Sequence, residues 1–156
     1  MPKPIRLSTE NFLIFGILLF AAAMRLWNIE HWTFTNDELS ALSRLQFDSL
    51  GAVLENGVKL NDAHPAGTQI FLYLWTAMFG TSEIAVRIPF VLIGVLCTYG
   101  IFQIGRRWIH FNAGLIAATL FAGLGFTVTY TLLARPYAPG LLGVIWVLLF
   151  ITKLVR

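Results

Sequence analysis

Residues 84–104 read IAVRIPFVLIGVLCTYGIFQI, and this stretch decides the fold class of the 156-residue chain. It carries one charged residue, Arg87, and is long enough to cross a bilayer, which takes about 20 residues of helix. The composition agrees, because 57% of the residues are hydrophobic, 12% are charged, and the mean hydropathy is +0.73. A soluble domain carries about 25% charged residues, so we predict an all-α integral membrane protein.

Three further segments have the length and apolarity of membrane-spanning helices. They cover residues 11–29, 111–133 and 136–152. The first follows Lys3 and Arg6 as a signal peptide would, but Arg25-Leu26-Trp27 stands where small residues would mark a cleavage site, so we interpret it as a retained anchor. The single cysteine, Cys97, excludes an internal disulfide. We therefore expect one membrane domain over residues 1–156 with about four spans.

A fifth apolar run, residues 66–79, is too short for a span and suits a short re-entrant or interfacial helix. If it does not cross, both chain ends and the 105–110 loop share one side of the membrane. The basic residues on that side, opposed only by Glu10, are Lys3, Arg6, Arg106, Arg107, Lys153 and Arg156. The positive-inside rule makes this side cytoplasmic, so we expect a bacterial inner membrane protein with the 30–83 loop periplasmic or extracellular. The basic residues flank spans rather than forming a basic face, which argues against nucleic acid as a partner.

The outer loop, residues 30–83, carries nearly all of the acidic residues and is where function is expected. Residues 38–54 predict an amphipathic helix lying on the membrane surface, because leucine and valine recur there at helical spacing opposite charged residues. The segment before it, Thr35-Asn36-Asp37-Glu38, fits a capping box, in which Thr35 and Glu38 satisfy backbone amides at the helix start. Helix capping alone is one interpretation of this acidic pair.

Other polar features also have plain structural interpretations when taken singly. Asp62-Ala63-His64-Pro65 has the form of a turn before a helix, and one histidine beside one aspartate is a weak metal signal. Arg87 and Arg135 lie at the outer ends of predicted spans, from which arginine side chains reach the membrane interface. The order of the whole set is more informative than its members.

The ordered features are the acidic pair at 37–38, the amphipathic segment, Asp62-Ala63-His64-Pro65, FGTSEIAVRIP at 79–89, Gly105-Arg106-Arg107, and Ala134-Arg135-Pro136-Tyr137-Ala138. This order resembles the N-terminal part of the GT-C glycosyltransferases. More narrowly, it is similar to the bacterial family 39 type related to protein O-mannosyltransferases and aminoarabinose transferases. The resemblance extends from the first predicted span to the fourth.

The resemblance implies a transferase that takes a sugar from a polyprenyl-phosphate carrier at the outer face of the membrane. The sugar passes to a lipid, glycan or protein acceptor. In such an inverting transfer an outer-loop carboxylate removes the proton of the acceptor hydroxyl, and the matching residue is Asp37, with Glu38 as its neighbour in the acidic pair. The implied partners are membrane lipid and the polyprenyl-phosphate sugar donor.

The same resemblance implies substrate-binding residues. Asp62 and His64 match a motif that lines the cavity of relatives. No cofactor is assigned, and a requirement for a divalent metal ion stays an open alternative. Arg87 and Arg135 would contact the carrier phosphate, because guanidinium matches phosphate oxygens in a paired geometry. Tyr137 belongs to the same motif as Arg135.

Three departures keep two hypotheses open. Relatives have two prolines where this chain has Pro65-Ala66, and an acidic residue where it has Leu133. Relatives also have more than ten membrane spans, whereas about four are predicted here. In the first hypothesis the chain is the N-terminal part of a glycosyltransferase, either a fragment or one half of a split enzyme. In the second it is a truncated, catalytically silent relative that serves as a structural subunit of a larger membrane complex. Small residues such as Gly114 and Gly123 allow close helix contact, either with a partner subunit or within the chain, and packing within the chain is the expected use of most of them.

Overall fold

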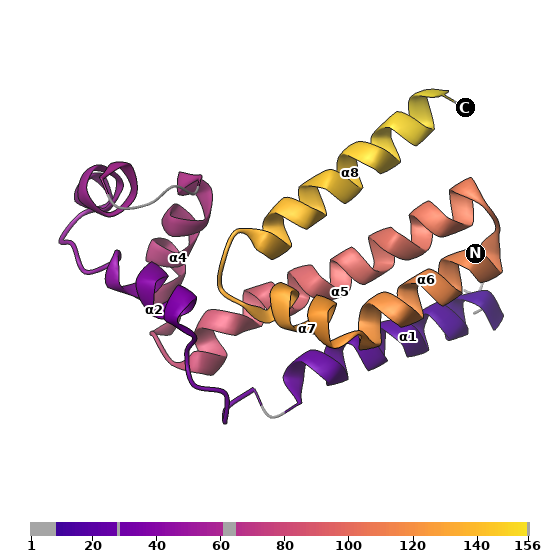
Figure 1. Cartoon of the computed structure of the whole chain (residues 1–156), viewed down its shortest axis with the longest axis horizontal. Helices are drawn as coiled ribbons and strands as arrows, with labels where there is room; N and C mark the ends of the chain where they lie inside the picture. Colours follow the sequence, from indigo (N-terminus) through magenta and orange to yellow (C-terminus); the bar gives the residue numbers. More distant parts are fainter. Residues whose placement is uncertain (1–8, 28, 61–64, 156) are drawn as a thin grey trace, which may run out of the picture.

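The computed structural model describes residues 9–27, 29–60 and 65–155, and its regular secondary structure there is entirely helical (Figure 1). Four helices form the body of the molecule: α1 (Thr9–Leu26), α5 (Glu83–Trp108), α6 (Phe111–Gly123) and α8 (Tyr137–Val155). Helix α5 is the central one and packs against the other three. Helices α1, α5 and α8 are each long and apolar enough to cross a membrane. The predicted all-α membrane fold is confirmed.

The predicted third span, residues 111–133, is not one straight helix. It is divided into α6 and α7 (Gly125–Leu132), whose axes meet at a bend of 67°. Only the two helices together are long and apolar enough to count as a fourth membrane span. Leu124 between them has extended backbone angles and is flanked by two glycines, which are poor helix formers. The Thr127 hydroxyl donates hydrogen bonds to the carbonyls of Phe121 and Leu124, so carbonyls near the break are satisfied.

The predicted amphipathic helix over residues 38–54 is also wrong in its extent. The structure has α2 (Asn36–Ser43), then a turn, then the short α3 (Leu50–Ala52) and a π-helix over Val53–Lys59. The Ser49 hydroxyl accepts a hydrogen bond from the backbone amide of Ala52 and so starts a new helix instead of continuing the first. The apolar residues on which the prediction depended therefore belong to separate helices and do not form one continuous apolar face.

Helix α4 (Ala66–Phe79) has the bounds predicted for the short apolar helix. It ends at Gly80, whose φ of 83° favours glycine. The indole Nε1 of Trp75 donates to the carbonyl of Ala85 over 2.8 Å and fastens α4 to the start of α5. At about 21 Å, α4 is shorter than the roughly 30 Å hydrocarbon core of a bilayer.

The small residues in the spans are used for contacts within the chain. An added Cβ at Gly105 would lie 2.8 Å from the Cα of Gly114, and one at Gly114 would lie 2.9 Å from the amide nitrogen of Arg106. An added Cβ at Gly123 would lie 3.2 Å from the Phe20 ring of α1. Of the two predicted uses of these residues, the structure shows packing within the chain, of α5 on α6 at Gly114 and of α6 on α1 at Gly123.

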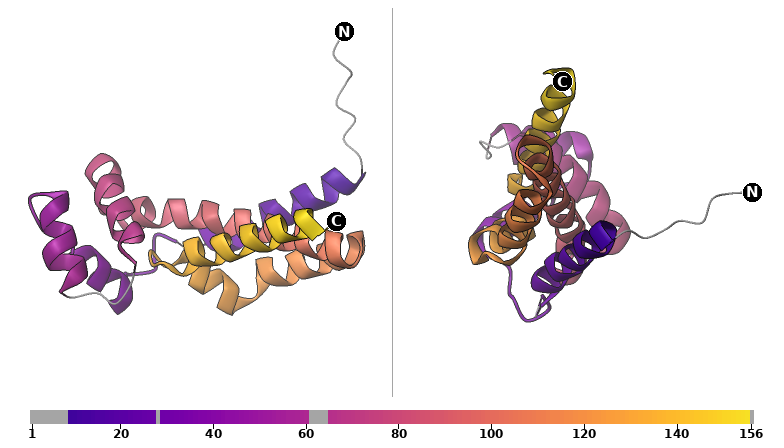
Figure 2. Two further views of the ribbon diagram at one scale, coloured as in Figure 1. Left: turned by 90° about the horizontal axis from the view of Figure 1, so that it is seen from above. Right: turned by 90° about the vertical axis from the view of Figure 1, so that its right-hand side faces the viewer.

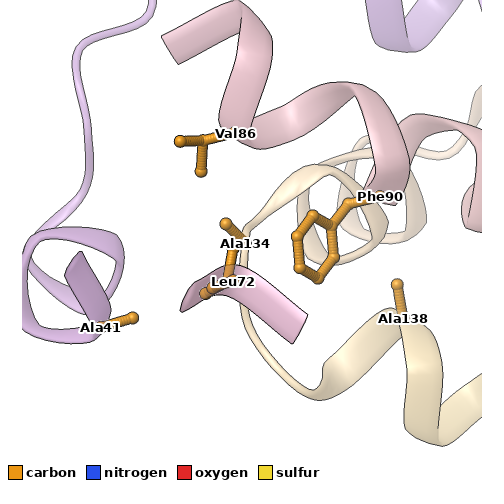
Figure 3. Packing of buried hydrophobic residues seen from close by; sticks show 6 residues of the cluster. All are labelled: Ala41, Leu72, Val86, Phe90, Ala134 and Ala138. Carbon is orange, nitrogen blue, oxygen red and sulfur yellow. The ribbon is translucent and has the colours of Figure 1, made fainter. Parts of the chain in front are cut away.

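The two ends of the bundle differ. Figures 1 and 2 show α2 and α4 gathered at one end, which we call the α2 end, while the start of α1 and the end of α8 lie at the opposite end. A small apolar core supports the α2 end (Figure 3). Its buried members come from α2, α4, α5, the α7–α8 connection and α8, and they are Ala41, Leu72, Val86, Phe90, Ala134 and Ala138. This core holds five segments together beneath the residues described next.

Candidate active site

The predicted capping box at the start of α2 is confirmed. The Thr35 hydroxyl accepts a hydrogen bond from the amide of Glu38, and a Glu38 carboxylate oxygen accepts one from the amide of Thr35 at 3.0 Å. The box orients the first turn of α2 and directs Glu38 back toward the rest of the bundle. The capping interpretation is thus correct, but it accounts for only one of the contacts that Glu38 makes.

Glu38 and Arg87 form a buried two-point ion pair. The Arg87 Nε donates to Oε1 of Glu38 at 2.9 Å and Nη2 donates to Oε2 at 2.7 Å, the paired geometry in which guanidinium matches carboxylate. Their side chains are 0% and 1% exposed. Arg87 also donates to the carbonyls of Trp32 and Thr33, and its guanidinium lies 5.4 Å from the Phe34 ring centroid. Arg87 is therefore committed to contacts inside the protein.

A third segment joins this ion pair. The backbone amide of Ala134, in the connection between α7 and α8, donates to Oε1 of Glu38 at 3.3 Å. Burial raises the pKa of the Glu38 carboxyl, whereas hydrogen bonds from Arg87, Thr35 and Ala134 and the positive charge of Arg87 lower it, and the net pKa lies below its usual value. Glu38 is therefore ionised at neutral pH and links α2, α5 and the α7–α8 connection.

Asp37, the other member of the acidic pair, has a different environment. Its side chain is exposed, and its Oδ2 accepts a hydrogen bond of 3.1 Å from the hydroxyl of Tyr137 in the first turn of α8. The Tyr137 ring in turn lies 5.4 Å from the ring of Tyr130 in α7. The structure thus brings together Asp37 and Tyr137, which the sequence had placed in one site although they are 100 residues apart.

Arg135 is the second predicted phosphate ligand. Its side chain is 5% exposed and lies beside Tyr137. The next residue, Pro136, lines a mostly apolar groove of about 490 Å³ between α4, α5 and α8. The remaining residues that form the groove are Pro65, Gly67, Thr68, Phe71, Phe90, Ile93, Pro139 and Gly140. The residue that follows Arg135 therefore lines an apolar groove, and the next one, Tyr137, holds the exposed carboxylate of Asp37.

Two predicted residues, Asp62 and His64, lie outside the described residues. Among residues 9–27, 29–60 and 65–155, no cluster of three or more His, Cys, Asp or Glu side chains is placed to hold a metal ion. Leu133, at the position of the acid in relatives, ends α7 with its amide bonded to the Thr129 carbonyl at 3.1 Å, and its side chain is half-buried.

Arg25 has a role that the sequence did not predict. It is 0% exposed, its Nε donates to the Thr131 hydroxyl at 2.9 Å, and its Nη1 donates to the Ala21 carbonyl. An added Cβ at Gly94 would overlap the Arg25 side chain. The sequence signal available for this contact was a glycine in one apolar span, Gly94, and an arginine in another, Arg25. Residue spacing alone does not show that these two helices are neighbours.

Comparison with known families identifies the class. Residues 63–156 match the model of a family of membrane glycosyltransferases of the GT-C class. The family is described as dolichyl-phosphate-mannose-protein mannosyltransferase, and since the match covers more than half of the chain, the chain belongs to it. Comparisons with curated protein sequences and with solved structures gave no match. Membership implies a polyprenyl-phosphate sugar donor, and the acidic pair at 37–38 lies before the matched region.

Proposed function

We propose that this chain carries the catalytic base of a polyprenyl-phosphate-sugar-dependent glycosyltransferase and that Asp37 is this base. The observation that carries the proposal is the division of the acidic pair between two environments. Glu38 is buried in an ion pair, whereas Asp37 is exposed. Consecutive residues of a helix point about 100° apart, so fixing Glu38 against Arg87 directs Asp37 outward. A general base needs a carboxylate held in a fixed direction and open to its substrate.

In the proposed reaction the acceptor hydroxyl attacks the anomeric carbon of the carrier-bound sugar. The bond between the acceptor oxygen and that carbon forms as the bond from the carbon to the phosphate oxygen breaks. The hydroxyl proton passes to the Asp37 carboxylate, and the polyprenyl phosphate leaves with the electron pair. The hydrogen bond from Tyr137 orients the carboxylate for this transfer.

We place the donor beside Arg135. Arg87 is fully engaged by Glu38 and two backbone carbonyls, which supports a positioning role for Arg87 instead of phosphate binding. Arg135 precedes Pro136, which lines the apolar groove, and in the proposal its guanidinium holds the phosphate while the prenyl chain lies in the groove. Asp62 and His64 stay proposed substrate-binding residues on the resemblance alone.

The charge distribution supports the proposed orientation in a bacterial inner membrane. Arg106, Arg107 and Lys153 are at the end of the bundle opposite Asp37, in the last turns of α5 and α8. The positive-inside rule then makes that end cytoplasmic and gives the α2 end to the periplasmic or extracellular side. Carrier-linked sugar would be used at that outer face.

The test replaces Asp37 by asparagine in the full-length protein in its native membranes, with polyprenyl-phosphate mannose as the labelled donor. We expect transfer to fall by at least about 100-fold, because positioned acid–base groups contribute roughly 10²–10⁴ in rate. The matched control is Asp48→Asn, which removes an exposed carboxylate from the same outer region and should leave transfer within about twofold. Equal protein levels by immunoblot exclude loss of folding, and transfer surviving in the Asp37→Asn protein would refute the base assignment.

The second candidate function is that of a catalytically silent structural subunit in a larger membrane complex, and the observation favouring it is Leu133. An apolar, half-buried side chain stands there in place of an acid. In that case Asp37→Asn changes neither the amount of the chain, nor its bound partners, nor any measured activity. Purification in mild detergent would then recover the chain together with an unrelated membrane complex, in a fixed proportion. Recovery of a chain bearing the rest of the transferase would favour the enzyme.

A further inference from the structure

Arg25 is a buried cation to which the proposed reaction gives no role. It is the last residue but one of α1, its side chain is 0% exposed, and its guanidinium lies 5.8 Å from the ring centroid of Phe121 in α6. Among the described residues no carboxylate forms an ion pair with Arg25, and its Nη2 has no hydrogen-bond acceptor. A buried arginine without a counter-charge lowers stability relative to an apolar side chain of similar volume. Its presence in an apolar span therefore indicates a role other than stability.

The contact of Arg25 with α7 is directional. Its Nε donates to the Thr131 hydroxyl at 2.9 Å and so joins residues that are 106 positions apart. Guanidinium donors have fixed directions, and the bond from Nη1 to the Ala21 carbonyl, also 2.9 Å long, holds the group in one orientation. On the α5 side the guanidinium packs against Gly94, where an added Cβ would overlap it. Because this chain already encloses the side chain of Arg25, the contact does not require another polypeptide.

Helix α7 depends on neighbouring helices for its direction. It has eight residues, which is too short for a helix to be stable alone, and no side chain of the described residues caps its start. The 67° bend separates its direction from that of α6. The Thr131 hydroxyl also donates to the Thr127 carbonyl within α7 at 2.6 Å, so the group that Arg25 holds is itself fixed to the helix. The hydrogen bond from Arg25 therefore sets where the second half of α7 lies.

The segment that follows α7 belongs to the proposed site. The Ala134 amide and the Tyr137 hydroxyl both donate to the acidic pair at 37–38, over 3.3 Å and 3.1 Å. Arg25 holds the same segment through Thr131, three residues before Ala134. The end of α7 and the start of α8 are thus fixed at two places by the N-terminal part of the chain. A shift of α7 at the first place would move the donors at the second.

We propose that Arg25 is a positioning residue for the proposed transfer reaction. Through Thr131 it holds α7 in place, so that the following segment presents Tyr137 to the Asp37 carboxylate. Arg25 itself is enclosed and touches no reacting atom. A misplacement of about 1 Å at reacting groups lowers a rate by roughly 100-fold, so one distant hydrogen bond is enough to affect transfer. The role in transfer rests on the proposed function, whereas the positioning of residues 131–137 is measured without it.

The first test measures hydrogen–deuterium exchange of the purified full-length protein in mild detergent. Arg25→Met removes the hydrogen bond and keeps a long, unbranched side chain. We expect amides of residues 131–137 to exchange roughly tenfold faster, the change expected when a hydrogen bond from a charged donor is lost. The midpoint of thermal unfolding should stay within about 2 °C or rise, because the variant no longer buries a charge without a counter-charge. An arginine that served stability alone would lower the midpoint when replaced.

A matched pair of threonine variants tests the acceptor. Thr131→Val removes the hydroxyl that Arg25 reaches, whereas Thr119→Val removes an exposed hydroxyl of α6 that donates to the Leu115 carbonyl of its own helix at 2.8 Å. Thr131→Val should speed exchange of residues 131–137 as Arg25→Met does, and Thr119→Val should change it by less than about twofold. Thr131→Ser keeps the hydroxyl and should retain slow exchange. The Arg25→Met/Thr131→Val chain should exchange no faster than the faster single variant, because both changes break the same bond.

The second test measures transfer from labelled polyprenyl-phosphate mannose by the same variants in native membranes. We expect Arg25→Met and Thr131→Val to lower kcat by roughly tenfold or more, with Thr131→Ser and Thr119→Val close to the unaltered chain. Unchanged exchange in Arg25→Met would overturn the positioning role even if Asp37→Asn abolishes transfer. A lowered unfolding midpoint, additive effects of the two single variants, or unaltered kcat despite faster exchange would also overturn it. Faster exchange combined with normal transfer by Asp37→Asn would instead refute the proposed base and leave the positioning of α7 standing.

Discussion

The ion pair between Glu38 and Arg87 gives the sharpest stability prediction, because the chain contains a matched exposed pair. Both pairs have a shortest N–O distance of 2.7 Å, but Glu38 and Arg87 are 0% and 1% exposed, whereas Glu55 and Lys59 are 65% and 67% exposed. Burial is therefore the main difference between them. Replacing each glutamate by glutamine removes one negative charge while nearly preserving side-chain shape.

The expected magnitudes differ widely. Glu38→Gln leaves the Arg87 guanidinium buried without its carboxylate, and removing one partner of a buried pair costs about 3–5 kcal/mol. For a chain of this length that corresponds to a fall of roughly 6–20 °C in the midpoint of thermal unfolding. Glu55→Gln breaks a solvated pair between residues four apart on a helix, and such a pair contributes about 0.3–0.5 kcal/mol.

The assay is thermal unfolding of the purified chain in mild detergent, followed by tryptophan fluorescence. A double-mutant cycle adds Arg87→Met and the Glu38→Gln/Arg87→Met chain, in which neither charge remains. The double variant should be more stable than the sum of the two single losses predicts, by about 2 kcal/mol or more. The reasoning is refuted if Glu38→Gln unfolds within 2 °C of Glu55→Gln, or if the losses of the two single variants add.

Two further predictions concern pH and packing. The pKa of Glu38 is lower in the folded chain than in the unfolded one, so its contribution to stability is complete above its usual pKa of about 4.5 and is lost as pH falls below it. Unfolding midpoints measured from pH 7 to pH 3 should fall at the acid end more for the unaltered chain than for Glu38→Gln, and parallel curves would contradict the assignment. Gly94→Ala would force a methyl group onto the Arg25 side chain and to 3.0 Å from the Thr131 hydroxyl, so it should lower the unfolding midpoint. Gly143→Ala, with nothing within 4 Å of the added Cβ, should leave the midpoint unchanged or raise it, and equal losses in the two variants would refute the packing argument.

Local features of this chain were predictable and long-range ones were not. The capping box at Thr35 and the bounds of α4 between Pro65 and Gly80 depend on residues a few positions apart, and both were predicted correctly. The pairing of Glu38 with Arg87 joins residues 49 apart, and no spacing rule relates them. Burial of Arg25 likewise depends on which helices become neighbours. Family resemblance predicted the class because it compares the order of motifs along the chain.

The interrupted helices show a second limit. Apolar runs over 111–133 and 38–54 satisfied the tests for continuous helices, yet each is broken in the structure. The breaks occur where a local alternative satisfies the backbone, through Thr127 in the first case and Ser49 in the second. Hydrophobic periodicity averages over a window and does not weigh such single side chains.

The bend between α6 and α7 also sets the depth of the proposed site. Eight residues of α7 span about 12 Å along their own axis, but a turn of 67° means that they advance only about 5 Å along the direction of α6. The α7–α8 connection, with Arg135, therefore stops several ångströms short of where a straight helix would have carried it. In the proposed orientation a lipid-linked substrate would then reach Arg135 from within the outer leaflet, and its long tail would not have to enter water.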